Sequence, residues 1–417
     1  MPFTESYHEP LILAAEQRLP NFVSTRLDEY YTDRMEKLWG GEHLLHWSSP
    51  GPNAIYVSSN DYLCIAAEPE LVKAQAACLM RGEADLLMST VFMREGSAQY
   101  RLEKKLAGFM GAEDGLITQS GWSANVGLLQ TIAGPGVPVY LDMQAHASLW
   151  EGVHAAQACS VPFLHNDVDH LRRQVLKHGA GVIVIDAVYS TNGSVAPLPE
   201  VLSIAEGSGS ILVVDESHSL GTHGPGGAGL VMQMGLSERV HFRTASLAKG
   251  FGGRAGFITC SSKFKGYFLS TSRPAIFSSC MLRHELAWFE AALDFIRNAD
   301  DRRVALHRNA RRVRDGLSAL GYNVSDGTEQ IIALEAGTEP KTQVLRKALE
   351  AEGIFGAVFC APATPKNRSL VRLTLNSGLT EVEIEQILQA CAAIREKVQL
   401  ADWSSSRRMA ASVRRPR

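Results

Sequence analysis

The chain has 417 residues, of which 45% are hydrophobic and 20% charged, an ordinary globular composition and a length sufficient for two cores. Its 41 basic and 44 acidic residues give a net charge of −3, which excludes a global basic field for binding nucleic acid. The seven cysteines are scattered and form no Cys-x-x-Cys pair, which argues against a disulfide scaffold. Charges throughout the first twenty residues argue against a signal peptide, and the absence of an apolar run of about 20 residues argues against a membrane span. Together these features predict a cytoplasmic protein.

Residues 1–64 are predicted to form an N-terminal helix and a short strand that belong to the smaller of two domains. Helical periodicity covers residues 20–40 and stops at a pair of glycines. A turn at residues 50–53, rich in proline and glycine, leads into the short strand AIYVSS.

Residues 65–295 are predicted to form a large domain around a mostly parallel sheet. Continuous apolar runs such as VPVYLDM, GVIVIDAVYS and ILVVDES alternate with helix-like stretches, the pattern of strands covered by helices on both faces. Residues 296–400 read as a smaller α+β domain. The segment 401–417 carries five arginines and no acid after residue 403, and we predict a disordered basic tail there.

Two sequence patterns resemble known binding motifs but lack the surroundings that those motifs require. The run from Gly224 to Gly229 matches Gly-x-Gly-x-x-Gly, but it does not join a strand directly to a helix as a dinucleotide-binding turn must. His218, His223 and Glu216 lack the spacing of a helical His-x-x-x-His pair, so no metal is predicted.

A different group of residues predicts pyridoxal phosphate. Asp215 ends the strand ILVVD, where ligands bind in parallel sheets, and Lys249 follows a later strand beside the hydroxyls of Thr244 and Ser246. The segment GLITQSGWSAN (115–125) reads as a strand and a helix whose first amides suit a phosphate. A lysine for the Schiff base, an acid for the pyridine nitrogen and donors for the phosphate are what this cofactor requires.

The chain resembles the α-oxoamine synthases in a series of segments that follow one another in this order: GLITQSGW, LDMQAHASLWEG, VYSTNGSVAPL, VVDESHSLGTHGPGGAG, TASLAKGFGG, RPAIFSS and VRLTLNS. These are enzymes of the pyridoxal-phosphate transferase fold type I that condense an acyl-CoA with an amino acid. The resemblance spans about residues 20–397 and is most specific to the α-hydroxyketone quorum-sensing autoinducer synthases, the CqsA type. It implies a homodimer with its active site at the interface.

The resemblance also implies roles for individual residues. Lys249 would bind the cofactor and remove the Cα proton, Asp215 would pair with the pyridine nitrogen, His218 would contact the ring O3′ and His146 would stack on the ring. Gly121, Trp122, Ser246 and Thr244 would hold the phosphate, and Ser278 or Ser279 would reach the phosphate of the neighbouring subunit. Arg372 would bind the substrate carboxylate, with Asn60 and Ser190 as weaker contacts.

The chain departs from ordinary members of the family in two places. Residues 88–109 lack a glycine-rich run and a histidine, and Ser377-Gly378-Leu379-Thr380 replaces the usual Ala-Ala-His-Thr. Both changes disfavour glycine, alanine or serine as the substrate and agree with the autoinducer-synthase subgroup. The expected reaction therefore joins a fatty acyl-CoA to a substrate that resembles 2-aminobutyrate or S-adenosylmethionine and gives an α-aminoketone.

Two alternatives remain at this stage. One is a general α-oxoamine synthase, of the 8-amino-7-oxononanoate synthase or 2-amino-3-ketobutyrate CoA ligase type, that uses alanine or glycine. The other is a pyridoxal-phosphate fold retained as a binding or regulatory protein.

Overall fold

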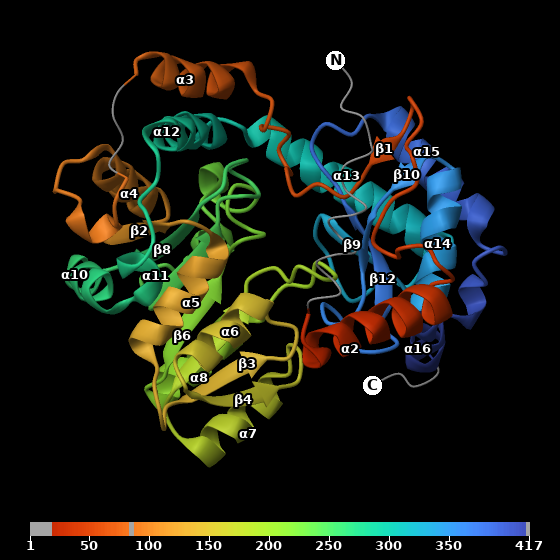
Figure 1. Cartoon of the computed structure of the whole chain (residues 1–417), viewed down its shortest axis with the longest axis horizontal. Coiled ribbons are helices and arrows are strands. Elements are labelled where there is room, and N and C mark those ends of the chain that lie inside the picture. Colours follow the sequence, from red (N-terminus) through yellow and green to blue (C-terminus); the bar gives the residue numbers. More distant parts are fainter. Residues whose placement is uncertain (1–18, 83–86, 414–417) are drawn as a thin grey trace.

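A seven-stranded sheet forms the centre of the larger domain in the computed structural model, which describes residues 19–82 and 87–413 (Figure 1). The strand order is β2-β8-β7-β6-β5-β3-β4; β8 is antiparallel to both neighbours and the other pairs are parallel. The strands are β2 (Asp114–Thr118), β3 (Pro138–Asp142), β4 (Cys159–Phe163), β5 (Val182–Asp186), β6 (Ile211–Asp215), β7 (Phe242–Ser246) and β8 (Gly256–Cys260). The predicted mostly parallel sheet is confirmed.

The central strands are apolar on both faces because a separate core covers each face. On β5, Val182 and Val184 enter the core beneath α5 (Gly121–Ile132) and α6 (Ala147–Ala155). Ile183 and Ile185 point the opposite way, into the core beneath α7 (Val168–His178) and α8 (Leu198–Ser208). Successive side chains of a strand alternate between faces, so a doubly covered strand reads as a continuous apolar run.

A third core lies at the β2–β8 edge of the large sheet. It joins α4 (Ala98–Phe109) and α12 (Arg283–Arg297), and α3 (Pro69–Met80) packs on α12 (Figure 1). The short elements nearby are η2 (Thr90–Phe92), η3 (Pro225–Gly227), α9 (Leu230–Gln233), α10 (Ser262–Thr271) and α11 (Arg273–Ile276). No helix in the described ranges is long and apolar enough to cross a membrane.

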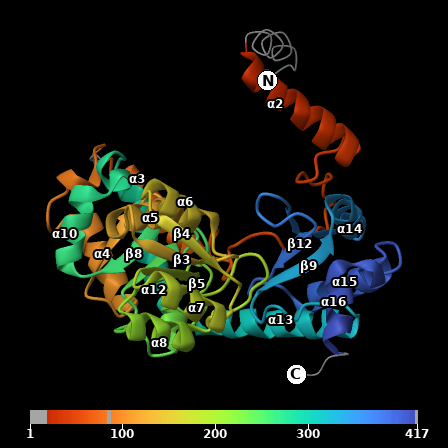
Figure 2. The same ribbon diagram turned by 90° about the horizontal axis from the view of Figure 1, so that it is seen from below.

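The long helix α13 (Asp300–Ala319) runs from the large domain to the small one (Figure 2). The small domain has the antiparallel sheet β11-β12-β9 and the parallel pair β1-β10, with α14 and α15 packed against each other. Its elements are β1 (Ile55–Tyr56), β9 (Ile331–Gly337), α14 (Glu339–Ala351), β10 (Ile354–Phe355), β11 (Ala357–Phe359), β12 (Ser369–Thr374) and α15 (Glu381–Ile394).

The N-terminal segment is held on the small domain by polar contacts. Helix α2 (Asn21–Glu29) continues into the wider-turned η1 (Tyr30–Leu38), from which Arg34 donates to the carbonyl of Ala361 at 2.7 Å. The indole of Trp39 donates to Glu339 of α14 at 2.7 Å. Helix α2 itself has no buried residue and stands away from the rest of the chain in Figure 2. Residues 1–18 lie outside the described part.

The predicted disordered tail is wrong for the part that the structure describes. After η4 (Leu400–Asp402), Trp403 is only 1% exposed within the small-domain core, and its indole donates to the carbonyl of Val398 at 2.9 Å. Helix α16 (Ser404–Val413) follows. Its Arg408 pairs with Glu335 of β9 at 2.8 Å, so this arginine has an acidic partner in another part of the chain. Residues 414–417 lie outside the described part.

Candidate active site

Three parallel strands of the large sheet end in aspartates at the same edge. Asp142 ends β3, Asp186 ends β5 and Asp215 ends β6, and the last two residues are partners in register. Ligands of open α/β sheets bind outside the carboxyl ends of the strands, so the fold places a site here. His146 begins α6 at this edge, and Lys249 follows β7.

The carboxylate of Asp215 is fixed by two donors. The side-chain amide of Asn125, on α5, donates to Oδ2 at 2.7 Å, and the backbone N–H of Ser217 donates to Oδ1 at 2.8 Å. Asn125 is fixed in turn, because its Oδ1 accepts a 2.6 Å hydrogen bond from the hydroxyl of Thr244. All three side chains are buried. The acid therefore has one defined orientation.

The surroundings of Asp186 shift its pKa toward the neutral carboxyl. Burial, and after it the neighbouring Asp215 and Asp142, raises the pKa of Asp186 well above its usual value. Its Oδ2 accepts from the backbone N–H of His146 at 3.1 Å, while its Oδ1 is buried without a partner in the described structure. A buried polar atom of this kind faces the space that a ligand would fill.

Lys249 enters the same space from the loop after β7. Burial lowers the pKa of its amine, the carboxyls of Asp215 and Asp186 oppose that shift, and Arg372 adds to it. A desolvated lysine with a lowered pKa is a better nucleophile toward a carbonyl carbon than a surface lysine.

The start of α5 forms the other end of this space. Ser120 caps the helix by accepting from the N–H of Ser123 at 3.1 Å. Gly121 is required, because an added Cβ would lie 2.7 Å from Cβ of Ser246. The Ser246 backbone is held by the hydroxyl of Ser217, which accepts from its N–H at 2.8 Å. The first amides of the helix therefore come close to the end of β7, as an anion site requires.

A cavity of about 200 Å³ unites these groups. Its lining includes Gly121, Trp122, Asn125, His146, Asp186, Ser190, Asp215, His218, Ser246 and Lys249. It offers a buried acid, a buried amine and amide donors at a helix start, and Asp186 Oδ1 is unpartnered beside it. This donor set fits pyridoxal phosphate.

The surroundings of His218 shift its pKa toward the neutral imidazole. Its Nδ1 lies 2.5 Å from the hydroxyl of Tyr62, and Gln330 donates to its backbone carbonyl at 3.0 Å. Burial, followed by the positive charges of Lys249 and Arg372, lowers the pKa of His218 well below its usual value. The pKa of His146 is also lowered, mainly by burial. Both shifts favour the neutral ring, which keeps one N–H donor and one acceptor nitrogen for contacts with a ligand.

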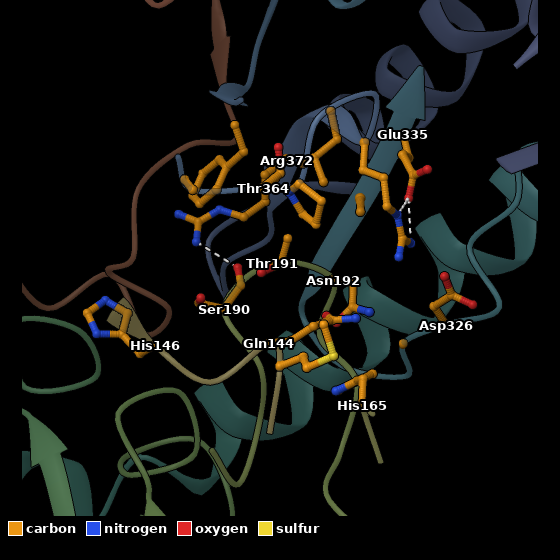
Figure 3. Close-up of a pocket in the computed structure, with 18 of the residues that line it drawn as sticks. Gln144, His146, His165, Ser190, Thr191, Asn192, Asp326, Glu335, Thr364 and Arg372 are labelled. Carbon is orange, nitrogen blue, oxygen red and sulfur yellow. Dashed lines mark hydrogen bonds and ion pairs between the residues drawn. The ribbon is translucent and has the colours of Figure 1, made fainter. Parts of the chain in front are cut away.

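Arg372 of β12 meets the two other residues predicted to contact substrate. Its Nη2 donates to Oδ1 of Asn60 at 3.1 Å, and its Nη1 donates to the carbonyl of Ser190 at 3.0 Å (Figure 3). The guanidinium lies 4.5 Å from the ring centre of Phe359, and only 5% of the residue is exposed. Ser190 takes part through its backbone, although the sequence draws attention to its hydroxyl.

A second cavity of about 860 Å³ extends from this site between the two domains. His146, Ser190, His218 and Lys249 line both cavities, so the two are adjacent. At the far side, Arg368 and Arg408 both pair with Glu335 at 2.8 Å, and Figure 3 shows Gln144, Asn192 and Thr364 on the intervening wall.

Three of the residues predicted to hold the phosphate lie outside the small cavity of this single chain. Thr244 does not line the small cavity, because it lies two residues deeper in β7 than Ser246 and instead supports Asn125. Ser278 and Ser279 line neither cavity in this single chain: the hydroxyl of Ser278 donates to the carbonyl of Pro274, and the carbonyl of Ser279 accepts from Gln119.

The sequence analysis missed Asn125, Asp186 and Tyr62. Asp186 had a usable signal, since it ends an apolar strand just as Asp215 does. Asn125 looked like an ordinary helix residue, and only the packing of α5 on the sheet brings it to Asp215.

The family model described as "Aminotransferase class I and II" matches residues 53–391 of the chain. The chain belongs to this family. It is 43% identical over 373 residues to a CAI-1 autoinducer synthase of Vibrio campbellii, an alignment that covers 89% of this chain and 95% of that protein. It is 29% identical to an 8-amino-7-oxononanoate synthase of Marinobacter nauticus, over 87% of this chain and 92% of that one.

The fold also matches a serine palmitoyltransferase from S. paucimobilis with a bound PLP–myriocin aldimine. The TM-score is 0.82 at 24% identity, with 90% of this chain and 98% of that one covered. Together these findings confirm the α-oxoamine synthase resemblance, the fold type I architecture and pyridoxal phosphate as the cofactor of this enzyme.

Proposed function

We propose that this enzyme condenses a fatty acyl-CoA with an amino substrate resembling 2-aminobutyrate or S-adenosylmethionine, with loss of carbon dioxide and CoA, to give the α-aminoketone precursor of an α-hydroxyketone signal. The observation that carries the proposal is that Lys249 and Arg372 open into one cavity of about 860 Å³, with space for a second substrate beyond them. The 43% identity to the CAI-1 autoinducer synthase supports this choice within the family.

The roles of the residues follow from their positions. Lys249 holds the cofactor through its amine and takes the Cα proton of the amino substrate. Arg372 binds the substrate carboxylate, for which its planar fork is suited. Asp215 holds the protonated pyridine nitrogen, and the start of α5 with Ser246 binds the phosphate. Pyridoxal phosphate supplies an electron sink for the charge left at Cα.

The reaction balances without a further reactant. The Cα of the amino substrate forms a bond to the thioester carbonyl carbon, and the thiolate of CoA leaves. The carboxylate leaves as carbon dioxide, and a proton returns to Cα. The buried side chains of His218 and Tyr62 close this end of the cavity to bulk water.

A panel of amino donors tests the proposal. The purified enzyme is incubated with octanoyl-, decanoyl- or dodecanoyl-CoA and with 2-aminobutyrate, S-adenosylmethionine, glycine, alanine or serine, and the ketones are identified by mass spectrometry. We expect product from one of the first two donors. Product from glycine or alanine alone would instead identify a general α-oxoamine synthase, as the 8-amino-7-oxononanoate synthase relatives would suggest.

We further propose a homodimer. Phe277 is 81% exposed and Phe92 is 61% exposed, and both flank Ser89 and Ser279, which bridge each other. Helix α2 adds Phe22, which is 70% exposed. Exposed apolar side chains such as Phe92 and Phe277 favour a protein partner, and a second copy would bring Ser278 or Ser279 toward the other site. Light scattering of the holoenzyme measures the mass.

A cytoplasmic location completes the proposal. Cys159 is an exposed free thiol, as is usual in a reducing compartment. Fractionation of cells that produce the protein at its natural level tests this location.

A further inference from the structure

A cluster of two histidines and a glutamate lies outside both active-site cavities. His223 comes from the loop after β6, His307 from α13 and Glu329 from the segment before β9. Nε2 of His223 is 2.9 Å from Oε2 of Glu329, and Nδ1 of His307 is 3.8 Å from the same oxygen. Within the described residues, this is the one group of three such side chains whose ligand atoms all lie within 4.8 Å of one another.

We propose that His223, His307 and Glu329 bind a divalent transition-metal ion of the zinc type. Two imidazole nitrogens and one carboxylate oxygen are the ligands of a three-residue zinc site, which leaves a fourth position for water or another small ligand. A cavity of about 850 Å³ lined by His223 and His307 provides that open position.

Each proposed ligand is oriented by a partner on its far side. The other ring nitrogen of His223 lies 2.9 Å from the hydroxyl of Thr222, and the other ring nitrogen of His307 lies 2.9 Å from the carbonyl of Thr222. The second oxygen of Glu329 accepts from the hydroxyl of Thr328 at 2.8 Å. Metal-binding histidines and carboxylates have such outer partners, which fix the ring tautomer and the direction of the ligand atom.

The hydrogen bonds of Thr222 are compatible with a metal-binding tautomer of His223. The hydroxyl of Thr222 can donate to the carbonyls of His218 and Ser219 and accept from Nδ1 of His223. In that tautomer the lone pair of His223 is on Nε2, which lies 2.9 Å from a carboxylate oxygen of Glu329. With His307 as the third ligand, the position suits a metal ion.

The surroundings favour a metal held by coordination. Arg303, Arg308, Arg311 and Arg312 line the cavity, so charge attraction alone would not retain a hard ion such as Mg²⁺ or Ca²⁺. Imidazole ligands select zinc and its neighbours. The bound ion would join the loop after β6 in the large domain to the segment before β9, beside Gln330, which already contacts the carbonyl of His218.

Zinc content tests the proposal independently of turnover. Untagged holoenzyme is stripped with a chelator, dialysed against Zn²⁺ in the presence of a competing indicator, and assayed by mass spectrometry for zinc per chain. We expect one tightly bound zinc ion per chain. When the stripped protein is treated with Mg²⁺ in place of Zn²⁺, we expect no bound magnesium. His307→Gln and Glu329→Gln should each weaken zinc binding at least about 100-fold, and Thr222→Val, which removes only an outer partner, about 10–100-fold.

The matched control is His154→Gln. His154 lies 3.7 Å from Glu151 on the exposed face of α6, a histidine–carboxylate pair that is not part of the three-ligand group, so zinc binding should not change. Wild-type protein that binds no saturable zinc, or His307→Gln and Glu329→Gln that bind zinc as tightly as wild type, would overturn the proposal. If those two variants do not fold, zinc-edge X-ray absorption of the wild type decides, since fewer than two imidazoles around the metal would contradict it.

Discussion

The side-chain amide of Asn125 donates a 2.7 Å hydrogen bond to the carboxylate of Asp215, and its own carbonyl oxygen accepts from Thr244. A helix and two adjacent strands thus fix the acid proposed to hold the pyridine nitrogen. The hydrogen-bonded series Thr244–Asn125–Asp215 is buried throughout. If a substitution removes one of these side chains, water can replace it only where the substitution leaves a cavity.

Asn125→Ala should therefore lower kcat and weaken cofactor binding. A hydrogen bond to a charged group contributes about 1.5–3 kcal/mol, which corresponds to a loss of roughly 10–150-fold. Thr244→Val, which removes only the support of Asn125, should have the smaller effect. Steady-state kinetics measure kcat, and titration of the apoenzyme with pyridoxal phosphate measures cofactor binding. Equal effects of the two variants would contradict the proposal that Thr244 acts through Asn125.

Lys249→Ala should abolish turnover and leave a folded protein, because the buried amine is proposed both to hold the cofactor and to move the Cα proton. Product analysis together with the circular dichroism spectrum checks this expectation. Lys104→Ala is the control, since Lys104 is partly exposed and pairs with Asp114, outside both active-site cavities. Product formation by Lys249→Ala would remove the lysine from its role.

Arg372→Lys should raise the KM of the amino substrate more than that of acyl-CoA. A lysine cannot reproduce two parallel donors, and it would lose the contacts with Asn60 and Ser190 that orient the guanidinium. We expect about a 10–100-fold increase, equivalent to one charge-assisted hydrogen bond. Arg368→Lys, at the far side of the cavity, is the comparison, and a larger effect of Arg372→Lys on acyl-CoA would reverse the assignment.

The lowered pKa of His218 predicts a pH dependence of stability. Because the folded state binds this proton less readily than the unfolded state, the contribution of His218 is fully present above its unfolded pKa of about 6.5 and is lost as the pH falls below it. The loss is at most about 1.4 kcal/mol for each pH unit. Urea unfolding of the apoenzyme at pH 7.5 and 5.5 should show a smaller difference for His218→Gln than for wild type. An equal difference would show that His218 is not the responsible group.

Trp403→Ala should destabilise the protein by about 3–5 kcal/mol, the usual cost of removing a buried aromatic side chain. Denaturant unfolding measures the change. Arg407→Ala, an exposed change on the first turn of the same helix, should stay within about 0.5 kcal/mol of wild type. A Trp403 variant as stable as wild type would mean that this indole does not contribute to the core.

The sheet and the residues at its strand ends could be predicted because their signals are local. A doubly covered strand such as ILVVD must be apolar, and the acid that follows it stands out. Thr244 was misplaced because two residues along a strand are about 6.6 Å, enough to move a hydroxyl from the cavity to the layer behind it. The ordered C-terminal helix was missed because its partner, Glu335, is distant in the sequence and only folding brings it to Arg408.

The side of the large cavity beyond Arg372 is closed by residues near the end of the chain. Ser405 and Arg408 of α16 line it, whereas Lys249, Asp215 and the start of α5 lie far earlier in the sequence. A chain shortened by about a dozen residues would therefore keep its cofactor site and lose part of the wall that faces the second substrate. Exchange of the C-terminal segment alone would then change the preference for the second substrate while leaving the cofactor site intact.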